Sequence, residues 1–202
     1  MTKILGLTGG IATGKSTVSK FFADLNIPIV DADLVAREVM KAGSPAVLEI
    51  KNQFGEEVLL KNGEINREYL GELIFSSPDK RKKLNEIVQD KIREAMETEK
   101  EKLLETGAAL LVLDIPLLYE ESYETEVDEV MVVYVDADVQ KARLLKRNTD
   151  LSEEDALNRI YSQMPLKEKV KKADVVINNN GTIEETLTQV RNWLEDNIPV
   201  EE

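Results

Sequence analysis

GGIATGKST, residues 9–17, follows the apolar run KILGLT (3–8) and precedes a helical pattern over about 15–25. The stretch fits the pattern G-x-x-x-x-G-K-[ST], with Gly9 in the first position and Gly14 in the sixth. Glycine is required in such a loop because a Cβ would keep backbone N–H groups from reaching phosphate oxygens. The N-terminus of the next helix adds N–H donors and the positive end of its dipole. Because the loop joins an expected strand to an expected helix, we predict a P-loop that binds the phosphates of ATP.

The side chains of this loop predict the chemistry at the phosphates. We expect Lys15 to reach the β- and γ-phosphates and to act in catalysis, and the Ser16 hydroxyl to ligate Mg²⁺. The other loop residues are expected to direct backbone N–H groups at phosphate oxygens. The residues predicted to bind ATP here are Gly10, Ile11, Ala12, Thr13, Gly14, Lys15, Ser16 and Thr17.

A carboxylate is expected beside the P-loop. The run LLVLDIP holds Asp114 at the end of an expected strand. In P-loop proteins an aspartate at this place holds Mg²⁺, directly or through water. Many strands end in aspartate, so the prediction depends on the P-loop as well as on Asp114. With Ser16, Asp114 completes the predicted metal site.

Short apolar runs alternate with helical patterns along the whole chain. Runs this continuous suit strands buried on both faces, and their alternation with helices predicts an α/β fold with a doubly wound, five-stranded parallel sheet. The expected strands span about 3–8, 27–33, 109–116, 128–138 and 173–178. Helices are expected at about 15–25, 34–42, 66–75, 78–106, 138–148, 152–163 and 182–197.

The uneven spacing of these strands predicts two helical excursions from one core. About 75 residues separate the second expected strand from the third, far more than one crossover helix needs. The second excursion carries nine Lys or Arg against five Asp or Glu, in a chain of net charge −13. It is either a solvated helical face or a surface that contacts an anion. We predict a P-loop core (1–39, 108–138 and 173–202), a helical acceptor-binding insertion (40–107) and a helical lid (139–172).

The motif VDAD at 30–33 places Asp31 and Asp33 at the end of an expected strand, where ligands bind in open α/β sheets. A phosphoryl acceptor needs a group that aligns its hydroxyl and accepts its proton, and Asp33 is a candidate for this role. The alternative is that Asp33 caps the helix that follows. VDAD recurs at 135–138, so one copy is expected to be only a cap. Spacing alone does not select between the two copies.

The composition excludes several classes of function. The 202-residue chain has 26 Lys or Arg and 39 Asp or Glu, which makes it a poor candidate for binding nucleic acid. Without cysteine or histidine it has no disulfide, no zinc–thiolate site and no acid–base chemistry by imidazole. No apolar stretch approaches 18 residues, and the first run is too short for a secretory signal. We expect a cytoplasmic protein that needs neither a membrane nor an obligate protein partner.

Among P-loop proteins, the sequence favours a small-molecule kinase. The guanine motif N-K-x-D of GTPase switches is not found, and ATP-driven motors are usually longer. One excursion would cover the acceptor, and the basic one would close over ATP and supply arginines to the transferring phosphoryl group. Two alternatives stay open, a kinase of another hydroxylated acceptor, such as a nucleoside or sugar acid, and a nucleotide-binding switch.

Six motifs in order make the resemblance specific: GLTGGIATGKST, DADLVARE, LDIPLLYE, KARLLKRN, ALNRIYSQMP and ADVVINNNGT. Together they resemble the dephospho-coenzyme A kinase family, from about residue 3 to residue 194. The resemblance implies transfer of the γ-phosphoryl group of ATP to the ribose 3′-hydroxyl of dephospho-coenzyme A, the last step of coenzyme A synthesis. It implies a core like that of nucleoside monophosphate kinases, a helical acceptor domain and a lid. ATP and dephospho-coenzyme A are then the substrates, with Mg²⁺ as cofactor.

The resemblance also assigns residues. It selects the first VDAD, with Asp33 as the catalytic base or the group that orients the hydroxyl. For several residues a structural role remains the alternative to substrate binding. These alternatives are a salt bridge, core packing, a solvated side chain or turn chemistry. Implied on the acceptor side are Asp31, Asp33, Arg37, Arg81, Leu117 and Leu118, and on the ATP side Arg147, Arg159 and Asn178.

One departure from the family pattern concerns the insertion. Many members carry His-Pro in its long helix, where this chain has Gln89-Asp90. No role of that histidine can operate here, because the chain has no histidine. The departure bears on acceptor binding rather than on the reaction.

Overall fold

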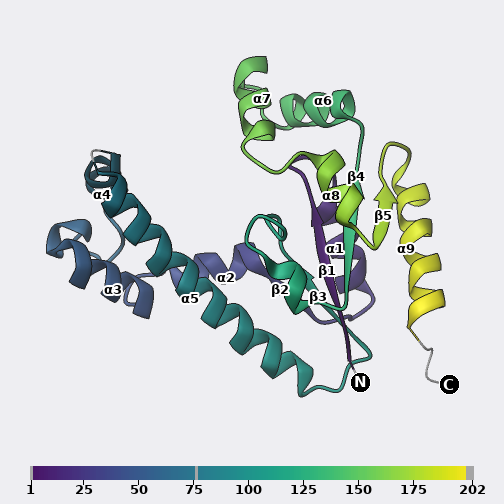
Figure 1. Ribbon diagram of the computed structural model, residues 1–202, viewed down its shortest axis with the longest axis horizontal. Helices are drawn as coiled ribbons and strands as arrows, with labels where there is room; N and C mark the ends of the chain where they lie inside the picture. Colours follow the sequence, from purple (N-terminus) through teal and green to yellow (C-terminus); the bar gives the residue numbers. More distant parts are fainter. Residues whose placement is uncertain (1, 76, 199–202) are drawn as a thin grey trace. The chain divides into compact units, whose positions relative to one another are not determined.

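The computed structural model describes residues 2–75 and 77–198 (Figure 1). The chain divides into two compact units. The first, here called the sheet unit, runs to Val30 and resumes at Leu103. The second, the helical unit, is Asp31–Lys102.

The sheet has five strands in the order β2-β3-β1-β4-β5. β1 is paired in parallel with β3 and β4, and β4 with β5. The predicted five-stranded, doubly wound α/β sheet is thus confirmed, and the P-loop strand β1 lies at its centre. The strands are β1 (Lys3–Gly9), β2 (Ile29–Asp31), β3 (Leu110–Asp114), β4 (Glu129–Tyr134) and β5 (Val175–Asn178).

The main core lies between the sheet and two helices, α1 (Lys15–Asp24) and α9 (Ile183–Asn197). Leu5 and Leu7 of β1, two residues apart, both point into it, as the period of a strand requires. α9 begins with a capping box in which Thr182 and Glu185 bond each other's backbone N–H groups. The buried residues of this core are Leu5, Leu7, Val18, Phe22, Leu110, Val112, Met131, Val133, Ile177, Val190 and Trp193.

Three helices follow β4 in the sheet unit, α6 (Ala137–Arg147), α7 (Glu153–Tyr161) and α8 (Leu166–Lys172). In Figure 1, β1 runs upward from the labelled N-terminus, and α6 and α7 lie beyond its upper end. The sequence predicted α6 and α7 but not α8. α8 has only seven residues, begins after Pro165 and reads as a charged run, which hides its helical period.

The helical unit has its own small core. Its elements are α2 (Ala32–Val39), α3 (Pro45–Phe54), the 3₁₀ turn η1 (Glu56–Val58), α4 (Arg67–Phe75) and α5, whose span Pro78–Leu104 continues into the sheet unit. The buried residues of this core are Ile50, Val58, Leu70, Leu84 and Ile87. A further 3₁₀ turn, η2 (Tyr123–Glu126), belongs to the sheet unit.

Across the described residues, none of the helices is long and apolar enough to cross a membrane.

Candidate active site

The P-loop joins β1 to α1 through a backbone that requires glycine. Gly14, the N-cap of α1, has φ +93°, in the left-handed region that favours glycine. Gly14 has no side chain that caps the helix, and the first turn of α1 has no acidic residue. No side chain of the N-cap or of the first turn therefore competes with a phosphate for the N–H donors at the start of α1.

Three side-chain amides hold this loop from outside it. Gln140 on α6 donates its Nε2–H to the carbonyl of Ile11 (2.9 Å), and Gln163 accepts the Ile11 N–H at Oε1 (2.8 Å). Asn179, just after β5, donates its Nδ2–H to the carbonyl of Thr13 (2.7 Å). None of these three amides was predicted from the sequence, because they are distant from the loop along the chain.

The same amides explain two of the glycines. A Cβ on Gly10 would lie 2.6 Å from Nε2 of Gln140, and a Cβ on Gly14 would lie 2.1 Å from Nδ2 of Asn179. Neither distance is sterically possible without movement of the amide. The absence of a side chain at these positions therefore lets the supporting amides reach the loop.

Lys15 and Asp114 meet at the carboxyl end of the sheet. The Lys15 ammonium donates to Oδ1 of Asp114 and forms an ion pair with it. The parallel register pairs Leu7 of β1 with Asp114 of β3, so Asp114 ends the strand beside the P-loop strand. Asp114 is buried, whereas Ser16, the residue after Lys15, is exposed.

Ser16 and Asp114 together fit the donor set of a P-loop metal site. Within residues 2–75 and 77–198, no three or more acidic side chains gather to hold a metal by themselves. A magnesium ion in a nucleotide site does not need such a cage, because phosphate oxygens and water supply most of its ligands. One hydroxyl and one carboxylate, on adjoining elements at the same edge of the sheet, are sufficient.

A buried lysine lies against the first residue of the P-loop. Lys169 on α8 is 0% exposed. Its ammonium donates to the carbonyls of Gly9 (3.3 Å) and Pro116 (2.9 Å) and to the Glu120 carboxylate (3.0 Å). Burial lowers the pKa of Lys169, the bond to Glu120 opposes this, and the nearby charge of Lys15 adds to the lowering. In the sequence, Lys169 was only one of many basic residues in 139–172.

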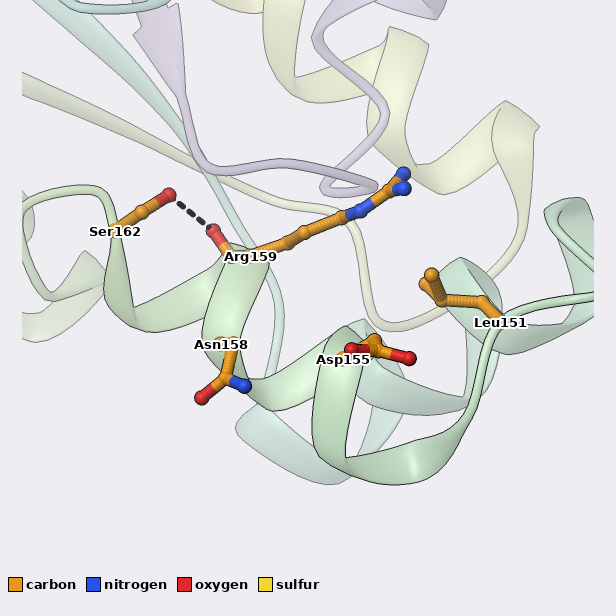
Figure 2. Close-up of a pocket in the computed structure, with 5 residues that line it drawn as sticks. All are labelled: Leu151, Asp155, Asn158, Arg159 and Ser162. Carbon is orange, nitrogen blue, oxygen red and sulfur yellow. Dashed lines mark hydrogen bonds between the residues drawn. The ribbon is translucent and has the colours of Figure 1, made fainter. Parts of the chain in front are cut away.

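The two arginines predicted to contact ATP are exposed on the helices after β4. Arg159 on α7 lines a cavity of about 510 Å³. Figure 2 shows its side chain extended from the helix, while its backbone carbonyl accepts the Ser162 hydroxyl (2.8 Å). Arg147 lies at the end of α6, and its Nε–H donates to the side chain of Asn148 (3.3 Å). Contact of either arginine with ATP stays a prediction.

Asn178 and Asn179, at the end of β5, have different environments in the structure. The Asn178 side chain is exposed and accepts the N–H of Asn180 (2.9 Å), which is the turn chemistry given as its alternative. Asn179 is buried, bonds the P-loop and accepts the Thr186 hydroxyl at its Oδ1 (2.7 Å). Contact of Asn178 with ATP stays a prediction.

In the first VDAD motif, Asp31 rather than Asp33 is the helix cap. Its Oδ1 accepts the N–H groups of Asp33 (2.9 Å) and Leu34 (3.1 Å) at the start of α2. Asp33 lies in the first turn, exposed, and its carboxylate bonds no residue that the structure describes. In the second motif, Asp136 occupies the N-cap position, but its carboxylate accepts the Tyr134 hydroxyl instead (2.8 Å).

The other residues assigned to the acceptor differ in exposure. Arg37 and Arg81 are exposed on helices of the helical unit, and Leu117 is half-buried. Leu118 is 0% exposed, and its Cδ1 would lie 2.6 Å from a Cβ placed on Gly6. The burial of Leu118 fits the core alternative, and its contact with the acceptor stays a prediction. The acceptor roles of Arg37, Arg81 and Leu117 stay predictions.

The helical unit also contains a cavity that the sequence did not indicate. It measures about 510 Å³ and has two cationic side chains in its wall, Lys41 and Arg67, with Glu64 among them. Apolar residues complete the lining, which consists of Met40, Lys41, Ala42, Glu64, Ile65, Arg67, Leu70, Gly71 and Ile74. INREYL at 65–70 had been interpreted only as the beginning of a helix.

Comparison with known proteins points to a single family. The family model described as dephospho-CoA kinase matches residues 3–185. A dephospho-CoA kinase of Bacillus cereus is 53% identical over 197 residues, which cover 96% of this chain and 98% of the relative. One of Enterococcus faecalis is 50% identical over 98% of both chains.

Solved structures agree with the sequence relatives. A Thermus thermophilus protein superposes with a TM-score of 0.79 at 31% identity, covering 96% of this chain and 97% of that one. The dephospho-CoA kinase of Campylobacter jejuni gives a TM-score of 0.72 at 28% identity, covering 98% and 100%.

Proposed function

The chain belongs to the dephospho-coenzyme A kinase family, and we infer that it transfers the γ-phosphoryl group of ATP to the ribose 3′-hydroxyl of dephospho-coenzyme A. The products are coenzyme A and ADP, so this is the last step of coenzyme A synthesis. The observation that carries the assignment is a P-loop with Lys15 at Asp114, in a chain 53% identical to a dephospho-CoA kinase over nearly its whole length.

The P-loop supplies the site for the ATP phosphates. No side chain caps α1 at Gly14, so the N–H groups of Lys15 and Ser16 are open to phosphate oxygens. Lys15 moves from Asp114 to the β- and γ-phosphates, where its charge offsets the charge that builds up as the bond between them breaks. Gln140 and Asn179 hold the loop carbonyls, so the phosphate-binding N–H groups are positioned before ATP binds.

Family membership implies a divalent metal with ATP, and we propose Mg²⁺. Ser16 and Asp114 are the residues that would hold it. They offer a hydroxyl and a carboxylate oxygen, and Ser16 follows Lys15 while Asp114 is bonded to it. When bound, the ion would offset the negative charge of the ATP phosphates.

For the acceptor, we propose that Asp33 aligns the 3′-hydroxyl and takes up its proton as the new O–P bond forms. The free carboxylate of Asp33 supports this role, because its neighbour Asp31 already serves as the helix cap. We further propose that the cavity with Lys41 and Arg67 receives an anionic part of dephospho-coenzyme A. Arg67, and Lys41 once it is released from its ion pair with Glu38, suit a ligand with phosphates.

For the segment 139–172, we propose that it closes over ATP during the reaction. Arg159 supports this, because it lines a cavity of its own and is free of a bond from its guanidinium to any residue that the structure describes. An arginine without an internal partner is available to the transferring phosphoryl group when such a segment closes.

The assay that tests the function measures ADP release from ATP and Mg²⁺, with dephospho-coenzyme A, adenosine or gluconate as the acceptor. We expect strong stimulation by dephospho-coenzyme A alone, with a product heavier by one phosphoryl group at the ribose 3′ position. Lys15→Met is the matched control and should abolish the stimulation. Equal stimulation by another acceptor, or none by dephospho-coenzyme A, would overturn the assignment.

A further inference from the structure

Lys169 is buried although it belongs to a helix of mostly exposed lysines. Lys167, Lys171 and Lys172 of the same α8 are exposed, whereas Lys169 has no accessible surface. Lysine is almost never fully buried unless it is paired, because the ammonium loses its hydration. The contacts of Lys169 must therefore compensate for this loss.

Its ammonium is fully used within the protein. An ammonium has three N–H donors and no acceptor. The acceptors of Lys169 are the Gly9 carbonyl (3.3 Å), the Pro116 carbonyl (2.9 Å) and the Glu120 carboxylate (3.0 Å). With three acceptor groups around it, the ammonium has no N–H donor left for a phosphate. Lys169 therefore does not bind phosphate as Lys15 is proposed to do.

The two carbonyls belong to the elements that carry the predicted catalytic groups. Gly9 is the first residue of the P-loop, and Pro116 comes two residues after Asp114. Thr8 donates its hydroxyl to the same Pro116 carbonyl (3.1 Å). Lys169 thus connects the carboxyl end of β1 to the residues that follow β3.

The same contacts connect the end of the segment 139–172 to these elements. Glu120 accepts the Met164 N–H at Oε1 (2.9 Å), and both of its carboxylate oxygens lie close to the Lys169 ammonium (2.9 and 3.0 Å). Gln163 accepts the N–H of Ile11 in the P-loop (2.8 Å). The return of the chain from α7 to α8 is therefore bound both to the P-loop and to the segment after β3.

We propose that Lys169 is a positioning residue for phosphoryl transfer, whose ammonium sets the spacing between the start of the P-loop and the strand end that carries Asp114. This rests on the proposed function, because the positioned groups are Lys15 and the metal ligand Asp114. A displacement of about 1 Å in a catalytic constellation can reduce the rate about 100-fold, so one buried donor at this junction has a large effect on rate.

The test compares Glu120→Gln with the double variant Lys169→Met/Glu120→Gln. Lys169→Met alone would leave Glu120 without its lysine and is expected to lower stability. The double variant removes both the ammonium and the carboxylate charge. Its difference from Glu120→Gln therefore reports mainly the bonds from the Lys169 ammonium to the Gly9 and Pro116 carbonyls. Lys171→Met is the matched control, since Lys171 lies on the same helix and is exposed. The readouts are thermal melting, kcat, KM for ATP, the Mg²⁺ concentration at half-maximal rate, and calorimetric binding of ADP with Mg²⁺.

Glu120→Gln leaves the buried Lys169 ammonium without its carboxylate, so we expect the double variant to melt no lower than Glu120→Gln but to have a kcat about tenfold to 100-fold lower. Its Mg²⁺ requirement should rise and it should bind ADP with Mg²⁺ more weakly than Glu120→Gln does, while Lys171→Met matches the wild type. Equal kcat in the double variant and Glu120→Gln would overturn the proposal, and so would failure of the double variant to fold. If the wild type does not phosphorylate dephospho-coenzyme A, the proposed function fails. In that case the positioning role of Lys169 is tested by ADP binding alone. Equal affinity of Glu120→Gln and the double variant for ADP with Mg²⁺ would overturn that role.

Discussion

The ammonium of Lys15 in the P-loop donates a hydrogen bond to the carboxylate of Asp114 at the end of β3. The parallel register that pairs Leu7 with Asp114 brings these distant residues together. In the proposed reaction Lys15 binds the ATP phosphates and Asp114 binds the metal ion. Their ion pair must therefore open when ATP and Mg²⁺ bind, and each partner exchanges the other for a ligand of opposite charge.

Asp114→Asn should accordingly affect metal-free and metal-bound nucleotide in opposite directions. Without the carboxylate, Lys15 is released, and we expect metal-free ATP to bind more tightly than to the wild type, by up to about tenfold. With Mg²⁺ present the variant loses a metal ligand, and kcat should fall by about 10²-fold or more. Calorimetric titration with ATP in EDTA and in Mg²⁺, together with steady-state kinetics, measures both effects. Equal weakening of ATP binding with and without Mg²⁺ would contradict the exchange.

Gly14→Ala tests the conformation of the loop. At φ +93°, an alanine is strained by about 1–3 kcal/mol, and its Cβ would lie 2.1 Å from Nδ2 of Asn179. We expect a lower melting temperature and loss of ADP binding, because Asn179 must leave the Thr13 carbonyl. Gly107→Ala is the matched control, since Gly107 has φ +71° with nothing within 4 Å of a new Cβ. It should show the strain without the loss of ADP binding, and similar binding losses in both variants would refute the role of Asn179.

The P-loop could be predicted from the sequence because its requirements are local. Glycine spacing, a strand before and a helix after are all contained within residues 3–25. The parallel sheet followed from apolar runs for the same reason. The supporting amides Gln140, Gln163 and Asn179 reach the loop only through the tertiary fold, so no pattern around residues 9–17 could indicate them.

Local ambiguity accounts for other differences. From the sequence, Asn178 was a candidate and Asn179 was not considered, whereas in the structure Asn178 is exposed and Asn179 is buried, as the alternation of a strand requires. The strand expected over 27–33 ends at Asp31, because Asp31 caps α2. No helix was predicted at α3, although its N-cap Ser44 is followed by proline at the first helical position, as Ser77 is before α5.

Tyr119 provides a prediction about pH. Burial, aided by the charges of Asp174 and Glu124, raises the pKa of its phenol to about 12. Between about pH 10 and 12 the unfolded chain therefore loses this proton while the folded chain keeps it, so stability should fall as pH rises through this window. Urea unfolding across that range, with phenolate absorbance as a parallel readout, measures the slope.

Tyr119→Phe should remove this contribution. The hydroxyl is buried and bonds no residue that the structure describes, so its removal at neutral pH should leave stability unchanged or raise it by about 1 kcal/mol. The ring, and with it the contact to the Lys172 ammonium 5.4 Å from its centroid, is retained. A variant with the same alkaline slope as the wild type would show that another group titrates in this window.

Asp31 and Asp33, two residues apart, should separate stability from catalysis. Asp31 accepts two backbone N–H groups at the start of α2, so Asp31→Ala should lower stability by about 1 kcal/mol, whereas Asp31→Ser can still cap and should not. Asp33→Asn should leave stability unchanged, because its exposed carboxylate bonds no residue that the structure describes, yet it should lower kcat for dephospho-coenzyme A. Thermal melting and kinetics on the three variants give both quantities. If Asp33→Asn keeps the wild-type kcat while Asp31→Ser loses activity at unchanged stability, then Asp31 is the acceptor-side carboxylate and the proposed role of Asp33 is wrong.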